Sequence, residues 1–371
     1  MALMISVIMP VFNGARFLSE AVESILQQTE SDLELIVVDD GSTDESPAIV
    51  RGYDDPRIVH ALRPHQGEPF ARNHGLGLAR GDFIAYLDAD DIALPSRLEV
   101  QRRQFFAPEI GYVHSDALLV DESSAPIGYW QAAALEPARL LRFFLKVGTP
   151  FNNPTLMFRR EAIGTLRHPT HYSIGADLDL LHQLTLRWRG VHVPEPLVFY
   201  RRTQGSLSNS AGDYRAYFSH MQALLERHPI AELVPETGGL EEGDTLGAAI
   251  VGYFLLRRGL HIDGKSWYER AVAAAQHERT QRFVMALGHL VTSEPQRAVM
   301  SLDACSPADH LIDNYLGEAY AHLGDPGRAA LHFRRALAAR PDYQEPVTHL
   351  KALGALRNLH LLDRSWRTFL K

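Results

Sequence analysis

The stretch Asp82-Phe83-Ile84-Ala85-Tyr86-Leu87-Asp88-Ala89-Asp90-Asp91 runs from an apolar segment directly into three carboxylates. The apolar part is typical of a buried β-strand, and the acids mark its end. Asp88 and Asp90 are two residues apart, so an extended chain presents both side chains on one face. Paired carboxylates suit a hard cation such as Mg²⁺ or Mn²⁺, which binds phosphate oxygens at its remaining positions. We therefore expect Asp88 and Asp90 to bind a metal ion and Asp91 to form a turn. The alternative is that these acids cap the next helix, near Pro95-Ser96.

Strands and helices alternate before this stretch. Apolar runs and helical spacing predict strands over 6–9, 33–38 and 57–62, and helices over 15–28, 43–51 and 68–79. Pro10 is expected to end the first strand. Strands joined by single helices imply right-handed crossovers and a mostly parallel sheet. The predicted fold class of the first half is therefore α/β.

Polar residues gather after the predicted strands, where open α/β sheets bind their ligands. These candidate binding residues are Phe12, Asn13, Asp39, Asp40, Arg63, Asp88 and Asp90. Arg72, in the third predicted helix, is a further candidate for contacting phosphates. Taken in isolation, Asp39 and Asp40 are better explained as caps of the helix after Gly41, and only their place at the strand end favours a ligand contact. Arg63 and Arg72 also fit the commoner fate of a solvated surface charge.

Four short motifs follow one another at 6–13, 37–44, 71–73 and 87–91. They read Ser-Val-Ile-Met-Pro-Val-Phe-Asn, Val-Val-Asp-Asp-Gly-Ser-Thr-Asp, Ala-Arg-Asn and Leu-Asp-Ala-Asp-Asp. Together they resemble family 2 inverting glycosyltransferases, which have the Rossmann-like GT-A fold of nucleotide-diphospho-sugar transferases. The resemblance implies that the first Asp-rich turn holds the base and ribose, while the Asp-x-Asp motif holds the metal and diphosphate. It makes Asp40 the preferred base contact and Asp90 the preferred metal ligand, and it places Pro10 and Phe12 in the base pocket.

The same resemblance suggests a catalytic base at Asp177, in the stretch 175–180. The family carries a Glu-Asp pair there, and Ala176 stands in place of the Glu. Asp177 is also suited to be the N-cap of a helix. A family segment of the form Tyr-Arg-x-His before Gly-Ser corresponds to 200–206, where Thr203 replaces the His. Residues 152–155 resemble the acceptor-side loop.

The implied reaction is a single displacement with inversion. Asp177 would take the proton from an acceptor hydroxyl, while Mn²⁺ or Mg²⁺ and arginines stabilise the departing diphosphate. The expected donor is a nucleotide-diphosphate sugar, with a UDP-linked sugar favoured, and the acceptor is a carbohydrate, a lipid-linked sugar or a protein. This chemistry belongs to cell-surface polysaccharide, glycolipid or glycoprotein biosynthesis.

Two other functions remain open. The differences at Ala176 and Thr203 are consistent with a catalytically decayed scaffold that binds sugar nucleotides and acts through its C-terminal half. A nucleotidyltransferase also uses paired acids on a doubly wound sheet, and is the weaker alternative.

The second half of the chain has a different pattern. Leu316, Gly317, Tyr320, Gly324, Ala329, Phe333, Ala336 and Pro341 follow the spacing of a tetratricopeptide repeat, a helix hairpin of 34 residues. Poorer copies lie near 244–278 and around Ala298. We predict a catalytic domain over 1–212, a helix and linker over 213–244, and an all-α repeat domain over 245–371. The repeats either cap the enzyme or bind a protein partner.

Composition narrows the remaining classes of function. The net charge of -8, without a long Lys/Arg run, disfavours nucleic acid as a partner. The single cysteine, Cys305, forms no intramolecular disulfide and is expected to be buried. No apolar run is long enough to span a membrane, and the N-terminus has no basic segment. This pattern predicts a cytoplasmic protein, and peripheral binding at the inner face of the membrane is the alternative. The stretch 139–146 is suited either to a membrane surface or to the core, and the loop 168–171 is expected at the surface.

Overall fold

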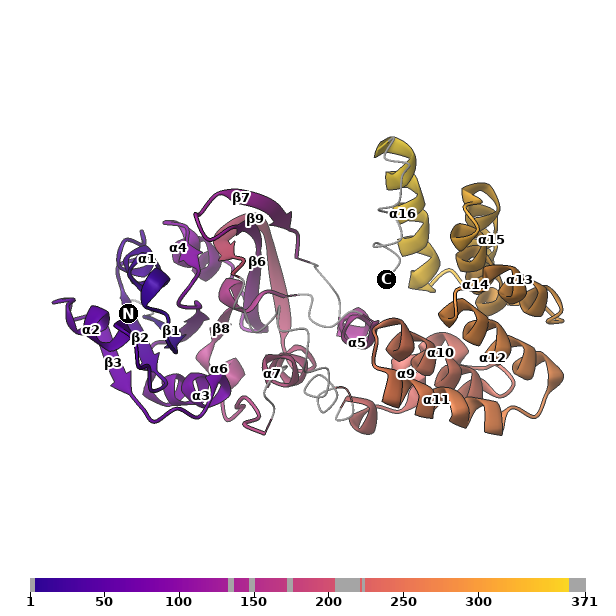
Figure 1. The fold of residues 1–371 in the computed structure, drawn as a ribbon, viewed down its shortest axis with the longest axis horizontal. Helices are drawn as coiled ribbons and strands as arrows, with labels where there is room; N and C mark the ends of the chain where they lie inside the picture. The colour runs from indigo at the N-terminus through magenta and orange to yellow at the C-terminus, as the bar shows by residue number, and fades with distance from the viewer. Residues whose placement is uncertain are drawn as a thin grey trace. The chain divides into compact units, whose positions relative to one another are not determined.

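The computed structural model describes residues 4–132, 137–146, 151–171, 176–203, 221 and 224–359. The chain divides into two units, Met1–Leu224 and Leu225–Lys371. The strands of the described residues all belong to the first unit, and its helices cover the sheet (Figure 1). The domain limits at 212 and 244 stay predictions, and the helix and linker expected over 213–244 begin outside the described residues.

The first part of the sheet is parallel, as predicted. Its strands lie in the order β3-β2-β1-β4, and each pair in this order is parallel. The elements are β1 (Ile5–Val11), α1 (Ala15–Leu26), β2 (Leu33–Asp39), α2 (Ser46–Arg51), β3 (Ile58–Leu62), α3 (Glu68–Leu78) and β4 (Phe83–Tyr86). α1 and α2 each join neighbouring strands, whereas α3 leads from the edge strand β3 back across the sheet to β4. All four strands run parallel, so their carboxyl ends lie on the same rim.

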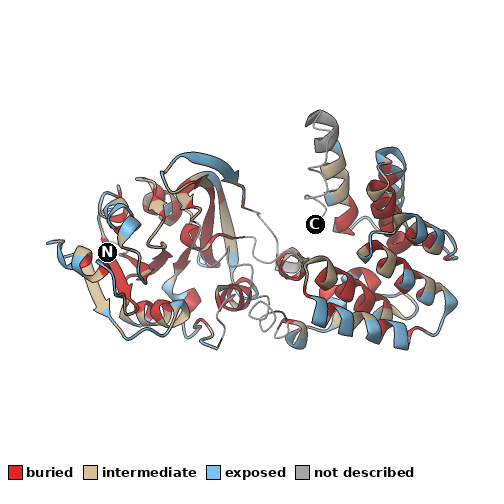
Figure 2. Cartoon of the chain, viewed as in Figure 1, coloured by how far each residue is buried: buried red, intermediate tan, exposed pale blue. Residues whose placement is uncertain are grey.

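Largely apolar runs explain why β1 and β2 each lie between two other strands of the sheet. Every residue of β2 is buried, and strands covered on both faces have near-continuous apolar sequences (Figure 2). On one face, α1 packs Leu18, Ala21, Val22 and Ile25, which recur at helical spacing. On α3, a Cβ added at Gly75 would lie 2.4 Å from Ile8 Cγ2, so only glycine allows this close approach to β1.

Pro10 does not end the first strand, contrary to expectation. β1 continues to Val11, and Pro10 pairs with Val38 of β2. Pairing of β1 with β4 has already ended at Ile8. Pro10 therefore lies where a missing N–H costs no hydrogen bond to β4.

The rest of the sheet is mixed, and the mostly parallel arrangement holds only for its first part. β8 (Met157–Arg159) pairs antiparallel with both β4 and β6, while β9 runs parallel to β6. β6 and β7 form a hairpin around Asp121–Ala125, because a short connection forces an antiparallel pair. The further elements are β5 (Ile92–Ala93), α4 (Arg97–Arg103), β6 (Ile110–Val120), β7 (Pro126–Trp130), α5 (Pro137–Lys146), η1 (Asn153–Thr155), α6 (Arg160–Ile163), α7 (Ala176–Thr185) and β9 (Arg189–Arg201).

Helix α5 packs into the first unit. Leu140, Leu141, Phe144 and Leu145 are buried, and the helix contacts α7. Core packing therefore accounts for this stretch, rather than a membrane surface. In the described part of the chain, no helix has the length and apolar character needed to cross a bilayer.

A buried acid joins β1, β2 and the segment before β4 at the rim opposite Asp88. Glu34 accepts a hydrogen bond from Ser6 Oγ at 2.7 Å and from Arg80 Nη2 at 2.7 Å. Burial alone would raise the pKa of this carboxyl, but the hydrogen bonds from Ser6 and Arg80 outweigh it and lower the pKa.

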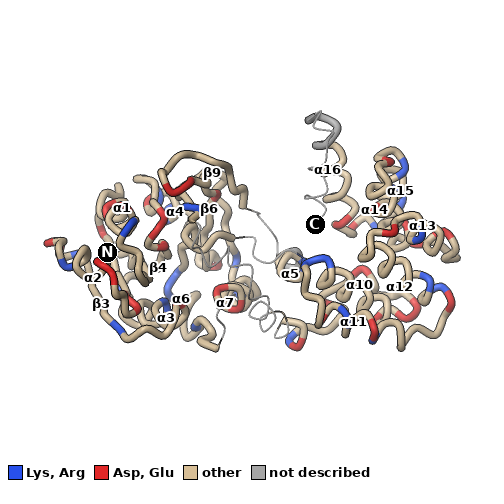
Figure 3. Tube along the Cα trace, in the orientation of Figure 1, with Lys and Arg blue, Asp and Glu red and all other residues tan. Residues whose placement is uncertain are grey.

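The described part of the second unit is helical throughout, with acidic and basic residues interspersed along it (Figure 3). Its elements are α9 (Ile230–Leu233), η3 (Pro235–Thr237), α10 (Gly243–Arg257), α11 (His261–Ala274), α12 (Glu278–Val291), α13 (Pro295–Asp303), α14 (His310–His322), α15 (Pro326–Ala339) and α16 (Gln344–Leu359). The pairs α10–α11, α12–α13 and α14–α15 pack as hairpins. Their corners carry Gly259, Ser293 and Gly324, all with positive φ.

Small residues let the two helices of a hairpin approach. A Cβ at Gly252 would lie 2.8 Å from Tyr268 N, and one at Gly317 would lie 2.5 Å from Phe333 Cε1. Cys305 is buried as expected, and burial raises the pKa of its thiol to about 11.

Candidate functional site

The loops after β1 and β2 are joined by hydrogen bonds. Asn13 has a φ of 51°, and its Oδ1 accepts from Thr43 N at 2.8 Å. Its own main-chain N–H donates to Ser42 Oγ at 2.9 Å. Asn is among the few residues that adopt this left-handed conformation readily, so Asn13 fixes one side of the rim.

Asp39 and Asp40 do not cap the helix after Gly41. The N-cap of α2 is Glu45, and Asp39 Oδ1 instead accepts from Ser42 N at 2.8 Å. Asp40 holds the loop before α3, with Oδ1 accepting from Gln66 N at 3.0 Å and Oδ2 from Gly67 N at 2.7 Å.

The hydrogen bonds of Asp39 and Asp40 differ in whether they leave an oxygen free to contact a nucleobase. Both Asp40 oxygens already accept main-chain N–H groups, and Asp40 is only 3% exposed. Asp39 Oδ2 is buried and has no hydrogen-bond partner among the described residues. The free acceptor therefore belongs to Asp39 and not to Asp40, the residue preferred from the sequence.

An aromatic pair lies beside these acids. The rings of Phe12 and His65 stack at 4.0 Å, and Phe12 is 47% exposed. His65 Nδ1 lies 2.8 Å from Asp40 Oδ2. Arg63 is partly buried and donates to Gln66 Oε1 at 3.0 Å. A flat, partly exposed stack next to buried acceptors has the character of a nucleobase site.

Arg72 is a buried ion-pair partner rather than a solvated charge. Its Nη2 lies 2.6 Å from Asp88 Oδ1 and 2.6 Å from Glu68 Oε1. Burial alone would lower the pKa of the guanidinium, but the carboxylates of Asp88 and Glu68 outweigh it and raise the pKa. Arg72 Nη1 is buried without a hydrogen-bond partner among the described residues. One donor thus remains for a further acceptor.

The acid turn after β4 presents two partly exposed carboxylates with different contacts. Asp88 is held by Arg72, whereas Asp90 is partly buried and accepts no side-chain hydrogen bond in the described chain. Burial, and then the neighbouring Asp88, raise the pKa of Asp90 to about 6. Asp91 is 1% exposed and closes the turn, with its N–H donating to Asp88 O at 3.1 Å. The acids do not cap α4, whose N-cap is Ser96.

This pair fits a divalent cation. Two crowded carboxylates destabilise each other's charge, and a cation between them would remove that cost. The described residues contain no group of three or more metal-binding side chains. An open site with two carboxylates leaves positions for phosphate oxygens and water.

Asp177 lies in the first turn of α7, next to the loop that precedes β8. Its Oδ2 accepts from Asn153 Nδ2 at 3.0 Å. β8 runs antiparallel to β4, with Met157 opposite Ala85, so the segment before β8 reaches the same rim as Asp88. Burial, and then Glu68, raise the pKa of the Asp177 carboxyl, while Arg72 lowers it.

Glu68 brings the separate parts of the site together. Its charge raises the pKa of Asp88, of Asp90 and of Asp177. It also follows Gly67, whose N–H binds Asp40. Side chains from distant parts of the chain therefore meet at one rim. The sequence reasoning missed Glu68, although its spacing of four residues from Arg72 is a recognisable ion-pair signal.

His168 is buried, contrary to the expected surface position. It is 2% exposed, its Nε2 lies 2.9 Å from Tyr86 Oη, and its main-chain groups bind the Asn73 side chain. Burial lowers the pKa of His168 to about 3, so the ring is neutral. It supports Tyr86 and the cation–π contact between Tyr86 and Arg72.

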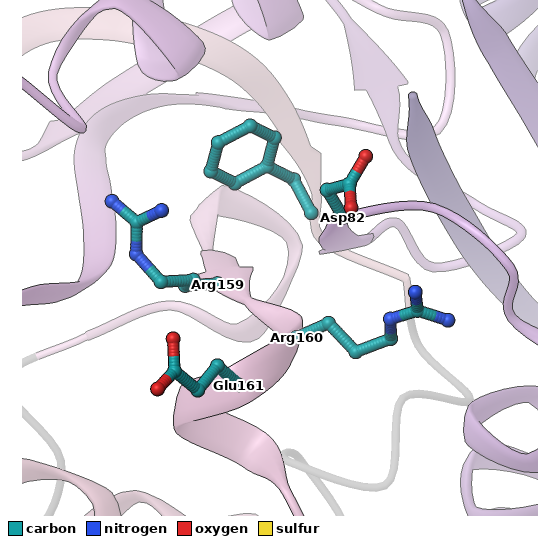
Figure 4. A pocket seen from close by; sticks show the side chains of 5 residues that line it. Asp82, Arg159, Arg160 and Glu161 are labelled. Carbon is teal, nitrogen blue, oxygen red and sulfur yellow. The ribbon is translucent and has the colours of Figure 1, made fainter. Parts of the chain in front are cut away.

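A surface hollow of about 360 Å³ lies at the other rim (Figure 4). It is lined by Asp82, Phe83, Arg159, Arg160 and Glu161. These residues stand at the start of β4 and around the end of β8. The hollow is therefore separate from the acid turn, which follows the end of β4.

The comparisons with known proteins agree with this arrangement. Residues 6–166 match the family described as Glycosyl transferase family 2. An uncharacterized glycosyltransferase of Haemophilus influenzae is 32% identical over 186 residues, which cover 49% of this chain and 73% of that protein. The chain belongs to glycosyl transferase family 2. Within this family-2 chain the four motifs lie around the ends of β1, β2 and β4 and in α3.

Two further proteins are similar to this family-2 glycosyltransferase. The succinoglycan biosynthesis protein ExoO of Rhizobium meliloti is 37% identical over 160 residues, or 42% of this chain and 44% of ExoO. The crystal structure of S. aureus TarS 1-349 in complex with UDP-GlcNAc matches with a TM-score of 0.53 and 16% identity, over 98% of this chain and 93% of that one. This match confirms the fold class, an α/β domain followed by a helical region.

The last family segment is only partly described. Arg201 ends β9, and Thr203 is the last described residue before 204–220, so Gly205 and Ser206 of the motif lie outside the described residues. Arg201 is the Arg of the Tyr-Arg-x-His segment, but the sequence gives no contact for it, and only the structure shows that it binds the acid turn.

Proposed function

We propose that this glycosyltransferase transfers a sugar with inversion from a nucleotide-diphosphate sugar, preferably UDP-linked, to an acceptor hydroxyl. The observation that carries the proposal is that Arg72 pairs with both Glu68 and Asp88. The charge of Glu68 also raises the pKa of Asp90 and of Asp177. Inverting transfer needs a base on the acceptor side and charge stabilisation on the leaving-group side, within one site.

Asp177 is the proposed base. Burial raises its pKa, and a carboxylate with a raised pKa is a stronger base than an exposed one. Asn153 orients the carboxylate by its hydrogen bond to Oδ2. Ala176, which replaces the usual Glu, has no polar side chain, so Asn153 in the loop before β8 is the proposed support of the base.

The donor would lie across the other loops. Phe12 and His65 supply the flat surface for the base, and Pro10, the residue before the last of β1, is proposed to line the same pocket. Asp39 supplies the free buried acceptor, and Asp40 and Asn13 hold the surrounding loops. Arg63 and the spare N–H group of Arg72 are the proposed phosphate donors.

Asp90 and Asp88 would hold Mn²⁺ or Mg²⁺. When bound, such an ion neutralises the charge that develops on the diphosphate leaving group. Asp88 is fixed for this role by Arg72, while Asp90 keeps its carboxylate available.

The helical unit is proposed to be a tetratricopeptide-like array. Its left-handed corners at 259, 293 and 324 are 34 and 31 residues apart, near the period of that repeat. Such arrays bind proteins or extended chains on their inner face. Since ExoO is named for succinoglycan biosynthesis, we propose a polysaccharide or lipid-linked saccharide as the acceptor, presented with the help of this unit.

Nucleotide release from a panel of sugar nucleotides tests the proposal. Purified full-length chain is incubated with UDP-sugars and Mn²⁺, and UDP formation is measured with and without added oligosaccharide. Asp177→Asn should abolish release while keeping nucleotide-sugar binding. Asp179→Asn is the matched control, because Asp179 lies on the same helix and binds Gln183. Unchanged turnover in Asp177→Asn would remove Asp177 from the mechanism.

The decayed-scaffold alternative predicts a different outcome. It predicts nucleotide-sugar binding without hydrolysis or transfer in the wild-type chain. Formation of pyrophosphate from a nucleoside triphosphate and a sugar phosphate would instead favour a nucleotidyltransferase.

A further inference from the structure

Arg201 connects the acid turn to two other parts of the first unit. It is the last residue of β9 and is only 2% exposed. Its main-chain N–H donates to Asp91 Oδ1 at 2.8 Å, and its Nε donates to the main-chain oxygen of Asp90 at 2.8 Å. Arg201 therefore binds two consecutive residues of the turn, one by side chain and one by main chain.

The rest of the guanidinium reaches other elements. Nη1 donates to Ser124 Oγ at 2.9 Å and to the carbonyl oxygen of Asp121 at 3.3 Å, both in the β6–β7 turn. Nη2 donates to Glu20 Oε2 of α1 at 2.6 Å. The guanidinium carbon lies 4.4 Å above the ring of Phe17, also on α1. One buried fork thus joins α1, the β6–β7 turn and the acid turn.

These contacts constrain the main chain of Asp90 and leave its carboxylate available. A carbonyl held at hydrogen-bond distance fixes the peptide plane, and so the direction in which the Asp90 side chain leaves the chain. The charge of Arg201 also lowers the pKa of Asp90 and of Asp91, against the effect of burial. A lysine has one compact ammonium group and cannot reproduce the planar fork.

We propose that Arg201 is a positioning residue for the acid turn, on which metal-assisted binding of a nucleoside diphosphate depends although Arg201 contacts neither ligand. The inference rests on the proposed function, because it needs a diphosphate and a cation at Asp90. The inference goes beyond the proposed function because it assigns the geometry of the metal site to Arg201, which lies 110 positions away from Asp91 in the chain.

The test separates the metal-dependent part of binding from the rest. The dissociation constant of UDP is measured by calorimetry on the full-length chain, once with EDTA and once with Mn²⁺. In Arg201→Lys the gain in affinity from Mn²⁺ should fall by about tenfold, the effect expected when a hydrogen bond to a charged group is lost. The dissociation constant in EDTA should stay within about twofold of wild type, because the base and ribose contacts lie on other loops.

Arg202→Lys is the matched control. Arg202 is the next residue, its guanidinium lies over the Tyr200 ring, and it makes no side-chain hydrogen bond in the described chain. Both dissociation constants should match wild type in this variant. Ser124→Ala is the milder second variant, which removes one acceptor of the fork and should reduce the Mn²⁺ gain in the same direction. It decides the matter if Arg201→Lys does not fold.

Three results would overturn the inference. If folded Arg201→Lys keeps the full gain in UDP affinity from Mn²⁺, the contacts of Arg201 do not determine the metal site. The same result in Ser124→Ala has this meaning when the lysine variant is unfolded. An equal loss of affinity in EDTA and in Mn²⁺ shows a general structural role. A wild-type chain that binds UDP and other nucleoside diphosphates in neither condition refutes the proposed function itself, and this inference with it.

Discussion

Replacing Asn153 by alanine should move the pH profile of the enzyme without changing its plateau. Asn153 Nδ2 donates to Asp177 Oδ2 at 3.0 Å, a bond that favours the ionised carboxylate. Its loss makes the ionised form less stable, so the pKa of Asp177, already raised by burial and Glu68, should rise further. A base acts only when deprotonated, and activity on the acidic side of the profile should therefore fall.

The size of this displacement follows from the strength of the bond. A hydrogen bond to a charged group contributes about 1.5–3 kcal/mol. Asp177 is partly exposed, so water replaces part of the lost interaction and the lower end applies. About 1.4 kcal/mol corresponds to one pKa unit, and the acidic limb of kcat/KM should move upward by about one pH unit.

The assay is the pH dependence of kcat/KM for sugar transfer, or for donor hydrolysis when the acceptor is not known. Gln183→Ala is the matched control, because Gln183 Nε2 donates to Asp179 Oδ2 at 2.9 Å on the same helix. The control should keep the wild-type profile. A loss in Asn153→Ala that is the same at every pH would refute this reasoning and would make Asn153 a substrate contact instead.

Three further predictions concern stability. Asp177→Asn should raise the free energy of unfolding at neutral pH, because a carboxyl with a raised pKa disfavours folding when it is ionised. The gain should shrink at acidic pH, where Asp177 is protonated in the folded and the unfolded state. Equal gains at neutral and acidic pH in urea titrations would contradict this. Glu34→Gln should lower the free energy of unfolding by about 2 kcal/mol at pH 7, because hydrogen bonds lower the pKa of Glu34 in the folded state. This loss should shrink as the pH falls below 4.5, the ordinary pKa of a glutamate. Thermal melts at pH 7 and below that pKa check the prediction. Gly317→Ala should lower the free energy of unfolding by about 1–3 kcal/mol, because the added Cβ would meet the Phe333 ring. Gly354→Ala is the control and should not destabilise the protein, because a Cβ there meets no other atom. Equal chemical-denaturation midpoints for the two variants would contradict the close packing at Gly317.

The parallel part of the fold was predictable because its signals are local. The apolar run of β2 and the helical spacing on α1 each identify their element without any distant partner. The mixed part was not, because β8 is three residues long and is defined by its pairing with β4 and β6. Pro10 shows the same limit, since its place inside β1 depends on where the neighbouring strand stops.

For the candidate site, the sequence predicted which residues lie at the rim better than it predicted the contacts that each residue makes. The motifs identified the acids of the rim, but tertiary hydrogen bonds decide what each acid does. Asp40 has both oxygens occupied by the loop before α3, while Asp39 keeps one free. His168 lies in a loop with polar neighbours, and only its contact with Tyr86 explains why it is buried.

The reversed direction of β8 has a consequence for how such enzymes diversify. The loops proposed to hold the nucleotide come from one uninterrupted stretch, residues 5–91, while Asn153 and Asp177 come from chain that follows it. In the proposed site, an exchange of the chain that carries Asn153 and Asp177 would therefore act first on the acceptor side. His168 of the same chain segment contacts Tyr86 and Asn73, so the donor side would stay in place only if these buried contacts were kept.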